Sequence, residues 1–162
     1  MKYLEFTDVE IHELKSEIIG ETFEILVKQP DPQILSLFGN KPLPVVYGTD
    51  ANLSAGGYIN TLEGLLLGGE IPPVLFIGIR YKLGDEPDFM QFATSRTREF
   101  TPTEDAENQK LMEQMTLREV KGGGAENFLK FLTTELRDWV SERFNVSDDT
   151  TYIGDSMGGL FG

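Results

Sequence analysis

A serine that stands between two glycines is the residue of this sequence whose type and spacing best suit chemistry. The stretch "TYIGDSMGGLFG", residues 151–162, contains Gly154, Ser156 and Gly158 in the pattern G-x-S-x-G. That pattern is typical of a nucleophile elbow, a sharp turn from a strand into a helix that presents the serine hydroxyl. Side chains two residues before and two residues after the serine would clash in so tight a turn, and the glycines remove them. The pentapeptide alone is a weak signal, since an ordinary Gly-rich turn has the same composition.

Strands and helices alternate along the chain in a way that can position such a turn. The stretches "DVEIHEL" (8–14) and "ETFEILVKQP" (21–30) predict an antiparallel hairpin with Gly20 in its turn. The apolar runs at 43–50 and 72–81 are typical of buried central strands, and "DDTTYIGDS" predicts a strand that leads into the serine. The order of these elements predicts an α/β domain with a mainly parallel sheet.

Two helices are predicted between these strands. The first lies in "AGGYINTLEGLLLGGE" (55–70). The second, at 125–144, carries its apolar side chains on one stripe, namely Phe128, Phe131, Leu132, Leu136, Trp139, Val140 and Phe144. Residues 82–122 are polar and predict a long irregular connection, a functional loop or lid with a short helix in "ENQKLMEQMTL". Met112 and Met115 in that stretch either belong to a small buried cap helix or line an acyl pocket.

Composition excludes several classes of function. A formal charge of −13 opposes the phosphate backbone of nucleic acids, so we expect no DNA or RNA partner. The absence of cysteine excludes disulfides, thiolate metal sites and cysteine nucleophiles. No stretch approaches the roughly 18 apolar residues of a membrane helix, and the N-terminus is too polar for a signal peptide. We therefore expect a soluble, cytoplasmic protein that makes no contact with membranes.

Metal and cofactor sites lack their usual patterns. The sequence has one histidine and no calcium-loop spacing, and "KGGGAEN" (121–127) lacks the G-K-[ST] ending of a phosphate loop. We expect neither a metal nor a cofactor. With 162 residues, of which 40% are apolar, the chain can bury one core, so it forms one domain or part of one.

Five stretches carry a family resemblance: "PVVYGTDAN", "IPPVLFIGIRY", "RTREFTPT", "GGGAENFLKFLTTELRDWV" and "YIGDSMGGLFG". In order and spacing they resemble the putative-esterase family of α/β-hydrolases, which includes enterochelin-type siderophore esterases, S-formylglutathione hydrolases, feruloyl esterases and mycolyltransferases. The resemblance covers nearly the whole chain. It implies an α/β-hydrolase fold and a serine esterase that acts on a small-molecule carboxylic ester.

The resemblance also implies roles for single residues. Ser156 would be the nucleophile that forms an acyl-enzyme, and the backbone N–H of Met157 one oxyanion donor. The second donor would be the backbone N–H of Asn52 or of its neighbour Ala51, which stands where the family usually has a glycine. Arg98 matches a family arginine that could hold an anionic or polar part of a substrate.

Ion pairs offer an alternative reading of the two arginines in "RTREFTPT". Arg98 can instead pair with Glu99 or Glu104, and for Arg96 such a structural pairing is favoured.

The acid and the base of a catalytic triad are missing from the sequence. In this fold they follow the serine, yet only six residues follow Ser156. The one histidine, His12, is expected on the strand face opposite Val9 and Ile11, at an exposed position. We therefore expect the chain to be the N-terminal half of an esterase, a single partial domain over 1–162 that ends just after the elbow. Alone, it should be inactive, and unstable or aggregated, because its last strand leaves an apolar sheet edge.

Two other functions stay open. One is a non-catalytic binding or interaction module that keeps the elbow without the chemistry. The other is acyl transfer to an acceptor other than water, which uses the same residues. The oligomeric state, the acyl group and the alcohol of the substrate are not predicted.

Overall fold

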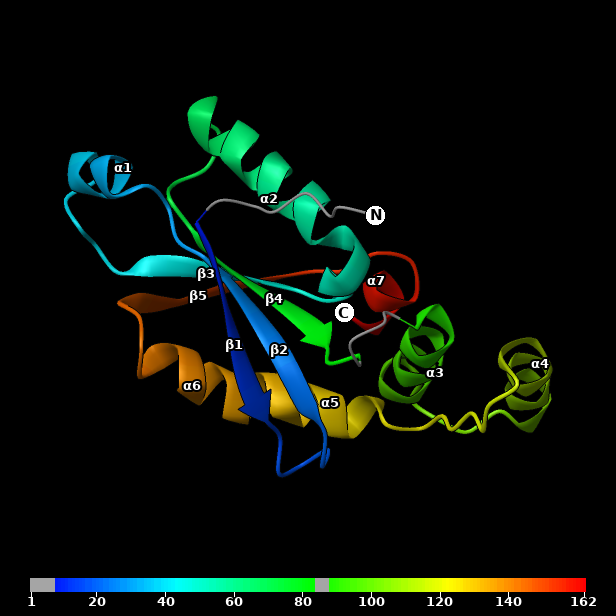
Figure 1. The fold of residues 1–162 in the computed structure, drawn as a ribbon. Coiled ribbons are helices and arrows are strands. Elements are labelled where there is room, and N and C mark those ends of the chain that lie inside the picture. Colours follow the sequence, from blue (N-terminus) through cyan, green and yellow to red (C-terminus); the bar gives the residue numbers. More distant parts are fainter. Residues whose placement is uncertain (1–7, 84–87) are drawn as a thin grey trace.

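The strands form one mixed sheet in the computed structural model, which describes residues 8–83 and 88–162 (Figure 1). The sheet has five strands in the order β1-β2-β4-β3-β5. Their bounds are β1 (Val9–Lys15), β2 (Thr22–Lys28), β3 (Leu43–Gly48), β4 (Leu75–Tyr81) and β5 (Val146–Ile153). Strands β1 and β2 form the predicted antiparallel hairpin, β2 runs antiparallel to β4, and β3 runs parallel to both β4 and β5. The predicted α/β class, with its parallel core and N-terminal hairpin, is confirmed.

The central position of β4 in the sheet explains why its sequence is apolar and does not alternate between apolar and polar residues. It is paired on both sides, by β2 and β3, and both of its faces are covered, so that residues 75–79 are all buried. Gly78 allows close packing at this point, because a Cβ there would lie 3.1 Å from the Cβ of Ala51 and 3.3 Å from that of Leu26. The helix that begins at Ala51 can therefore approach the sheet closely.

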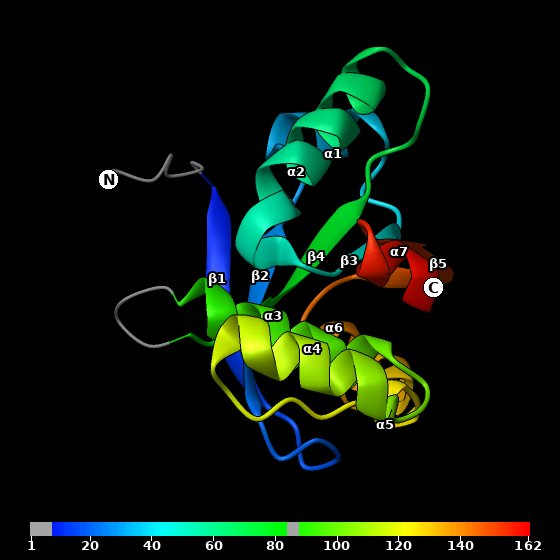
Figure 2. The same cartoon turned by 90° about the vertical axis from the view of Figure 1, so that its right-hand side faces the viewer.

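Helices cover both faces of the sheet (Figures 1 and 2). On one face lies α2 (Ala51–Leu67), with the short helix α1 (Pro32–Leu37) near its far end. On the other face α5 (Ala125–Phe131), η1 (Leu132–Leu136) and α6 (Arg137–Ser141) form one continuous helix. Its predicted apolar stripe faces the sheet, and the main core joins that stripe to the side chains of β2 and β4.

The segment η1 is one turn of π-helix, and its Glu135 holds the turn of the β1–β2 hairpin. The carboxylate accepts hydrogen bonds from the Ser16 hydroxyl at 2.5 Å and from the backbone N–H groups of Glu17 and Ile18 at 2.9 and 3.2 Å. Ser16 is fully buried. The hairpin and the long helix are therefore joined by polar contacts as well as by the core.

Residues 82–122 differ from the predicted irregular connection. They contain α3 (Phe89–Phe100) and α4 (Ala106–Thr116), of which only α4 matches a predicted helix. Asp88 caps α3 by accepting hydrogen bonds from the N–H groups of Met90 and Gln91. The polar side chains of α3 hid this helix, because Phe92 and Phe100 supply most of its buried apolar surface.

Helix α4 projects from the rest of the chain beyond α3 (Figure 1). Met115 on this helix is 65% exposed and Met112 is half-buried. The expected buried cap helix is therefore wrong, because Thr116 is the one residue of α4 that is buried.

Candidate active site

Ser156 lies on a sharp turn between β5 and the short helix α7 (Met157–Phe161). Its backbone angles are φ 54° and ψ −120°, a conformation that residues other than glycine rarely adopt. The side chain is exposed. The predicted strand-turn-helix setting is present, and the strained serine is held at the carboxyl end of a parallel strand.

The two flanking glycines are required by the packing of this turn. A Cβ on Gly154 would lie 2.5 Å from the backbone carbon and oxygen of Gly158. A Cβ on Gly158 would lie 2.8 Å from Asp50 Oδ2 and 2.8 Å from Thr49 Oγ1. Any side chain at either position would push apart the turn or the loop that packs against it.

The loop that packs against the turn is Gly48-Thr49-Asp50, which joins β3 to α2. Strand β3 is paired with β5, so the loop and the turn leave neighbouring strands at the same edge of the sheet. The N–H of Thr49 donates to the carbonyl of Ile153 at 3.2 Å. Asp50 adopts a left-handed conformation, φ 57° and ψ 28°, and is the last residue before α2.

Backbone N–H groups follow both the loop and the turn. Within residues 8–83 and 88–162, the N–H groups of Ala51, Asn52 and Met157 donate no hydrogen bond. The side chain of Asn52 is fixed elsewhere, since its amide nitrogen donates to the carbonyl of Tyr81 at 3.0 Å and its oxygen accepts from the N–H of Tyr81 at 2.9 Å. Free backbone N–H groups of this kind are the donors that an oxyanion hole needs. Ala51 and Asn52 follow the end of β3, and Met157 follows the end of the adjacent strand β5.

An ion pair between the buried Asp50 and the half-buried Arg96 joins the loop to α3. Arg96 comes from α3, and its Nε and Nη2 donate to the two carboxylate oxygens of Asp50 at 2.7 and 2.8 Å. The same Nη2 lies 3.4 Å from the carbonyl oxygen of Asp155, next to Ser156. Burial raises the pKa of Asp50, and the nearby charge of Asp155 adds to this, whereas Arg96 lowers the pKa by its hydrogen bonds and its charge.

A second polar link joins the loop to α7 through two hydroxyl groups. The Tyr152 hydroxyl donates to the carbonyl of Gly158 at 2.6 Å, so the Thr49 hydroxyl, 2.9 Å away, donates to Tyr152 in turn. Burial raises the pKa of Tyr152 to about 12, so this phenol keeps its proton at neutral pH. The loop and the turn are thus joined by the ion pair, by these hydroxyl groups and by backbone contacts.

Arg98, the predicted substrate contact, is occupied by carboxylates. Its Nη2 donates to Glu99 at 2.5 Å and its Nη1 to Glu21 at 3.1 Å. Of the two carboxylates that the sequence suggested as partners of Arg98, Glu99 forms the pair, and Glu21 is a partner that was not predicted. Arg96, two residues earlier, is the arginine that the structure brings to Ser156.

His12 lies on β1, at the edge of the sheet away from β5. As predicted, it is on the face opposite Val9 and Ile11, but the expected exposure is wrong. His12 is half-buried with its ring centre 5.3 Å from that of Trp139, whereas Ile11 is 54% exposed. Its Nε2 lies 2.9 Å from a carboxylate oxygen of Glu10. The histidine is therefore separated from Ser156 by the width of the sheet.

Sequence reasoning missed Asp50 and Arg96 as parts of the site. Two features could have identified them: the left-handed backbone of Asp50 just before α2, and the position of Arg96 on a helix beside the turn. Neither feature can be recognised without the fold.

Among the described residues, no group of three or more His, Cys, Asp or Glu side chains could hold a metal ion. In the same part of the chain no helix is long and apolar enough to cross a membrane.

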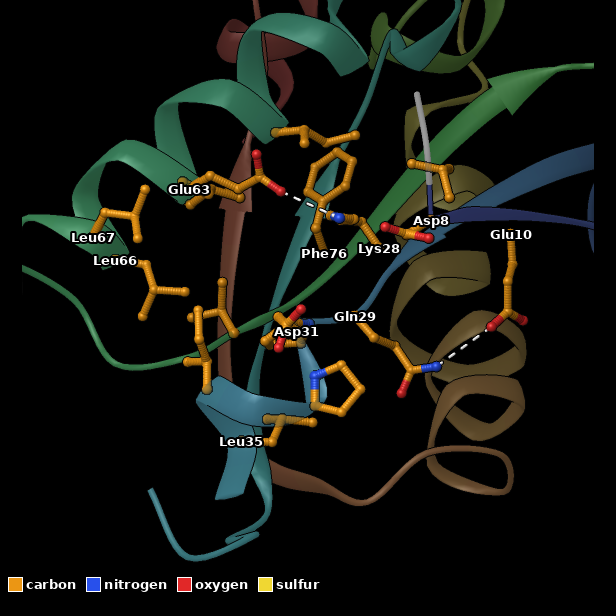
Figure 3. Close-up of a pocket in the computed structure, with 17 residues that line it drawn as sticks. Asp8, Glu10, Lys28, Gln29, Asp31, Leu35, Glu63, Leu66, Leu67 and Phe76 are labelled. Carbon is orange, nitrogen blue, oxygen red and sulfur yellow. Dashed lines mark hydrogen bonds and ion pairs between the residues drawn. The ribbon is translucent and has the colours of Figure 1, made fainter. Parts of the chain in front are cut away.

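A pocket between α1 and α2 does not include Ser156 among the residues that line it (Figure 3). Its volume is about 740 Å³, and it is formed by α1, α2, the end of β2 and the starts of β1 and β4. Lys28 and Glu63 form an ion pair across it at 3.2 Å. This pocket is at the amino end of the parallel strands, whereas ligands of open α/β sheets bind at the carboxyl end, where Ser156 lies.

Comparison with solved structures found several that share the fold of this chain, at sequence identities that establish the fold alone. It resembles the BES protein from Bacillus cereus with 21% identity and a TM-score of 0.72, covering 99% of this chain and 56% of that one. An IroE-like serine hydrolase from Shewanella oneidensis has 22% identity and a TM-score of 0.69, with coverage of 94% and 44%. Siderophore hydrolase EstB from Aspergillus nidulans has 22% identity and a TM-score of 0.67, with coverage of 99% and 53%.

The chain thus spans about half the length of these solved structures, so it forms only part of their α/β-hydrolase fold. A comparison with curated proteins found no match. The family model described as "Putative esterase" matches residues 16–162, which is most of the chain. The chain therefore belongs to this esterase family.

Proposed function

We propose that this protein is a serine hydrolase of carboxylic esters, with Ser156 as the nucleophile. The observation that carries this proposal is the exposed, strained serine at the strand-to-helix turn, followed by an N–H group, that of Met157, without a partner in the described structure. Strain of this kind persists only where the surrounding structure imposes it, and it is often found at active sites.

In the proposed reaction the hydroxyl oxygen of Ser156 attacks the carbonyl carbon of the ester. The hydroxyl proton passes to a general base, and the carbonyl oxygen becomes an anion that accepts hydrogen bonds from Met157 N–H and from the N–H of Ala51 or Asn52. When the carbonyl re-forms, the alcohol leaves with a proton and the acyl group stays on Ser156. Water then attacks the acyl-enzyme and releases the acid.

The base and the acid that orients it are proposed to lie outside these 162 residues. The only histidine of the sequence is His12, on the far edge of the sheet. A serine hydroxyl without a base is a poor nucleophile at neutral pH, so the chain alone should react slowly or not at all. The substrate proposed is a small-molecule ester of the siderophore type, because structural neighbours include siderophore hydrolases and an enterobactin and salmochelin hydrolase.

The test is labelling with a fluorophosphonate probe, which phosphonylates an activated serine with loss of fluoride. It is applied to this chain and to a longer polypeptide that contains it, each beside Ser156→Ala and beside Ser147→Ala, a control on the same strand. We expect the longer form to label, Ser147→Ala to label equally, and Ser156→Ala not to label. A folded longer form that does not label at Ser156 would refute the esterase proposal and favour a binding module that keeps the turn without the chemistry.

A further inference from the structure

We propose that Arg96 is a positioning residue, which fixes the loop at Asp50 against the turn at Ser156. The proposal rests on the proposed function, because the positioned groups are the oxyanion donors. Arg96 is suited to this role because its guanidinium contacts two segments that are distant in sequence. It binds the Asp50 carboxylate 46 residues earlier, and its Nη2 also lies 3.4 Å from the carbonyl oxygen of Asp155, 59 residues later.

The ion pair is built to hold one geometry. Both oxygens of Asp50 accept from the planar guanidinium, which fixes the orientation of the two groups as well as their distance. The side chain of Asp50 is 3% exposed and that of Arg96 is 19% exposed. The guanidinium carbon also lies 5.3 Å from the ring centre of Phe92 and 5.7 Å from that of Phe100, so the aromatic rings limit its movement.

Asp50 does not serve its own helix in the usual way. A residue at this position normally caps the helix with its side chain, but the carboxylate of Asp50 makes no such bond with α2. Its oxygens are committed to Arg96 instead. Because the buried carboxylate binds Arg96 and does not cap α2, we assign it a role in orienting the loop.

Displacement of Asp50 would reach both sets of oxyanion donors. Ala51 and Asn52 follow it directly in the chain, so their N–H groups move with it. On the other side, Oδ2 of Asp50 packs against Gly158, 2.8 Å from the place where a Cβ would lie, and Gly158 follows Met157. The contact of Arg96 with the carbonyl oxygen of Asp155 is long, at 3.4 Å, so Arg96 acts on the oxyanion donors mainly through Asp50.

The charge of Arg96 alone cannot fulfil this role. Lysine keeps the charge but binds a carboxylate as a point, without the fork of the guanidinium. We therefore expect Arg96→Lys to weaken the positioning in part and Arg96→Met to abolish it. Asp50→Asn, which keeps the shape of the side chain and removes its charge, should resemble Arg96→Met.

The experiment measures labelling of Ser156 at several concentrations of a fluorophosphonate probe, in the longest polypeptide that contains this chain. Rates are expressed per folded molecule. For Arg96→Met we expect the maximal labelling rate to fall about 10- to 100-fold, since misplacement by about 1 Å can cost that much. The probe concentration that gives half of the maximal rate should stay within about twofold, because Arg96 does not bind the probe.

Arg80→Met is the matched control. Arg80 also forms a half-buried pair, with its Nε 2.6 Å from Glu24 Oε2, but it joins β4 to β2 away from the turn. This variant should lose some stability and keep the labelling rate per folded molecule. If Arg80→Met slows labelling as much as Arg96→Met does, general loss of structure explains both effects and the proposal is wrong.

Amide hydrogen exchange gives a readout that does not require activity. In Arg96→Met we expect faster exchange in peptides covering 49–54 and 154–161, with no such change in Arg80→Met. If the wild type fails to label, the esterase proposal fails, while the exchange data still decide whether Arg96 holds the loop and the turn. Unchanged exchange at both segments, or an unchanged labelling rate in Arg96→Met, would overturn the positioning role.

Discussion

Replacing Gly154 by alanine tests the steric explanation of the turn at Ser156. A Cβ at this position would lie 2.5 Å from the carbonyl carbon and oxygen of Gly158 and 2.7 Å from the amide nitrogen of Gly159. All three are backbone atoms, so no side-chain rotation relieves the overlap. To restore ordinary contacts of about 3.5 Å, α7 must move away from β5 by roughly 1 Å.

This movement has a cost in stability and a cost in rate. Forcing an extra carbon into a filled site destabilises a protein by about 1–3 kcal/mol. For a chain of this length each kcal/mol lowers the melting temperature by about 2–4 °C, so we expect a loss of about 2–12 °C in Gly154→Ala. A displacement of about 1 Å also moves Ser156 and Met157 relative to the loop after β3, and can slow acylation about 100-fold.

Thermal unfolding and fluorophosphonate labelling measure the two costs, and Gly57→Ala is the control. Gly57 lies inside α2, is exposed, and would bring no atom within 4 Å of an added Cβ. Alanine there should stabilise the helix by about 0.5–1 kcal/mol. If Gly154→Ala melts and labels like the wild type, the turn is not as tightly packed as described and the steric reasoning is refuted.

Three further predictions concern the other parts of the structure. Arg98→Gln should lower the melting temperature, because it breaks the contacts with Glu99 and Glu21, and should leave the KM for an ester unchanged; a raised KM with unchanged stability would instead support substrate binding by Arg98. Leu136→Ala, at a fully buried position, should cost about 2–5 kcal/mol in urea unfolding, and a loss below about 1 kcal/mol would contradict the packing of the long helix on the sheet. Burial raises the pKa of Glu99 above its ordinary value of 4.5, so the folded state holds the carboxyl proton more tightly than the unfolded state does. The stability that this proton contributes is therefore full below pH 4.5 and is lost as the pH rises through the raised pKa. In Glu99→Gln the free energy of unfolding should therefore fall less between pH 4.5 and neutral pH, and equal slopes for the two proteins would show that Glu99 does not titrate in this way.

Local pattern was enough to predict most of the sheet. The hairpin, the apolar central strands and the long helix each bury a continuous face, so the spacing of their apolar residues follows directly from their geometry. The two missed helices, α1 and α3, bury less. Helix α1 has no buried residue and is marked only by Asp31, which caps it, and by Pro32 at its first position.

The site was predicted only where it is local in sequence. The turn at Ser156 is contained in five residues, so its glycines could be interpreted from steric reasoning alone. The pairing of Asp50 with Arg96 depends on how α3 packs between α5 and α7, which no local pattern specifies. For the same reason the sequence could not show that Arg96 pairs with Asp50 and lies beside the carbonyl oxygen of Asp155.

The turn of π-helix at η1 has a consequence for how many residues this part of the chain needs. Phe128, Leu132, Leu136 and Val140 are spaced by four, and in an uninterrupted α-helix each such step overshoots a full turn by about 40°. Val140 would then be rotated by about 120° from Phe128 and would leave the sheet, whereas the wider π turn returns it to the buried face. Removal of one residue between Leu132 and Leu136 would reduce that rotation to about 20° in an ordinary α-helix. The helix thus accommodates one residue more than its apolar face requires, and a chain shortened by one exposed threonine there would keep the same side chains against the sheet.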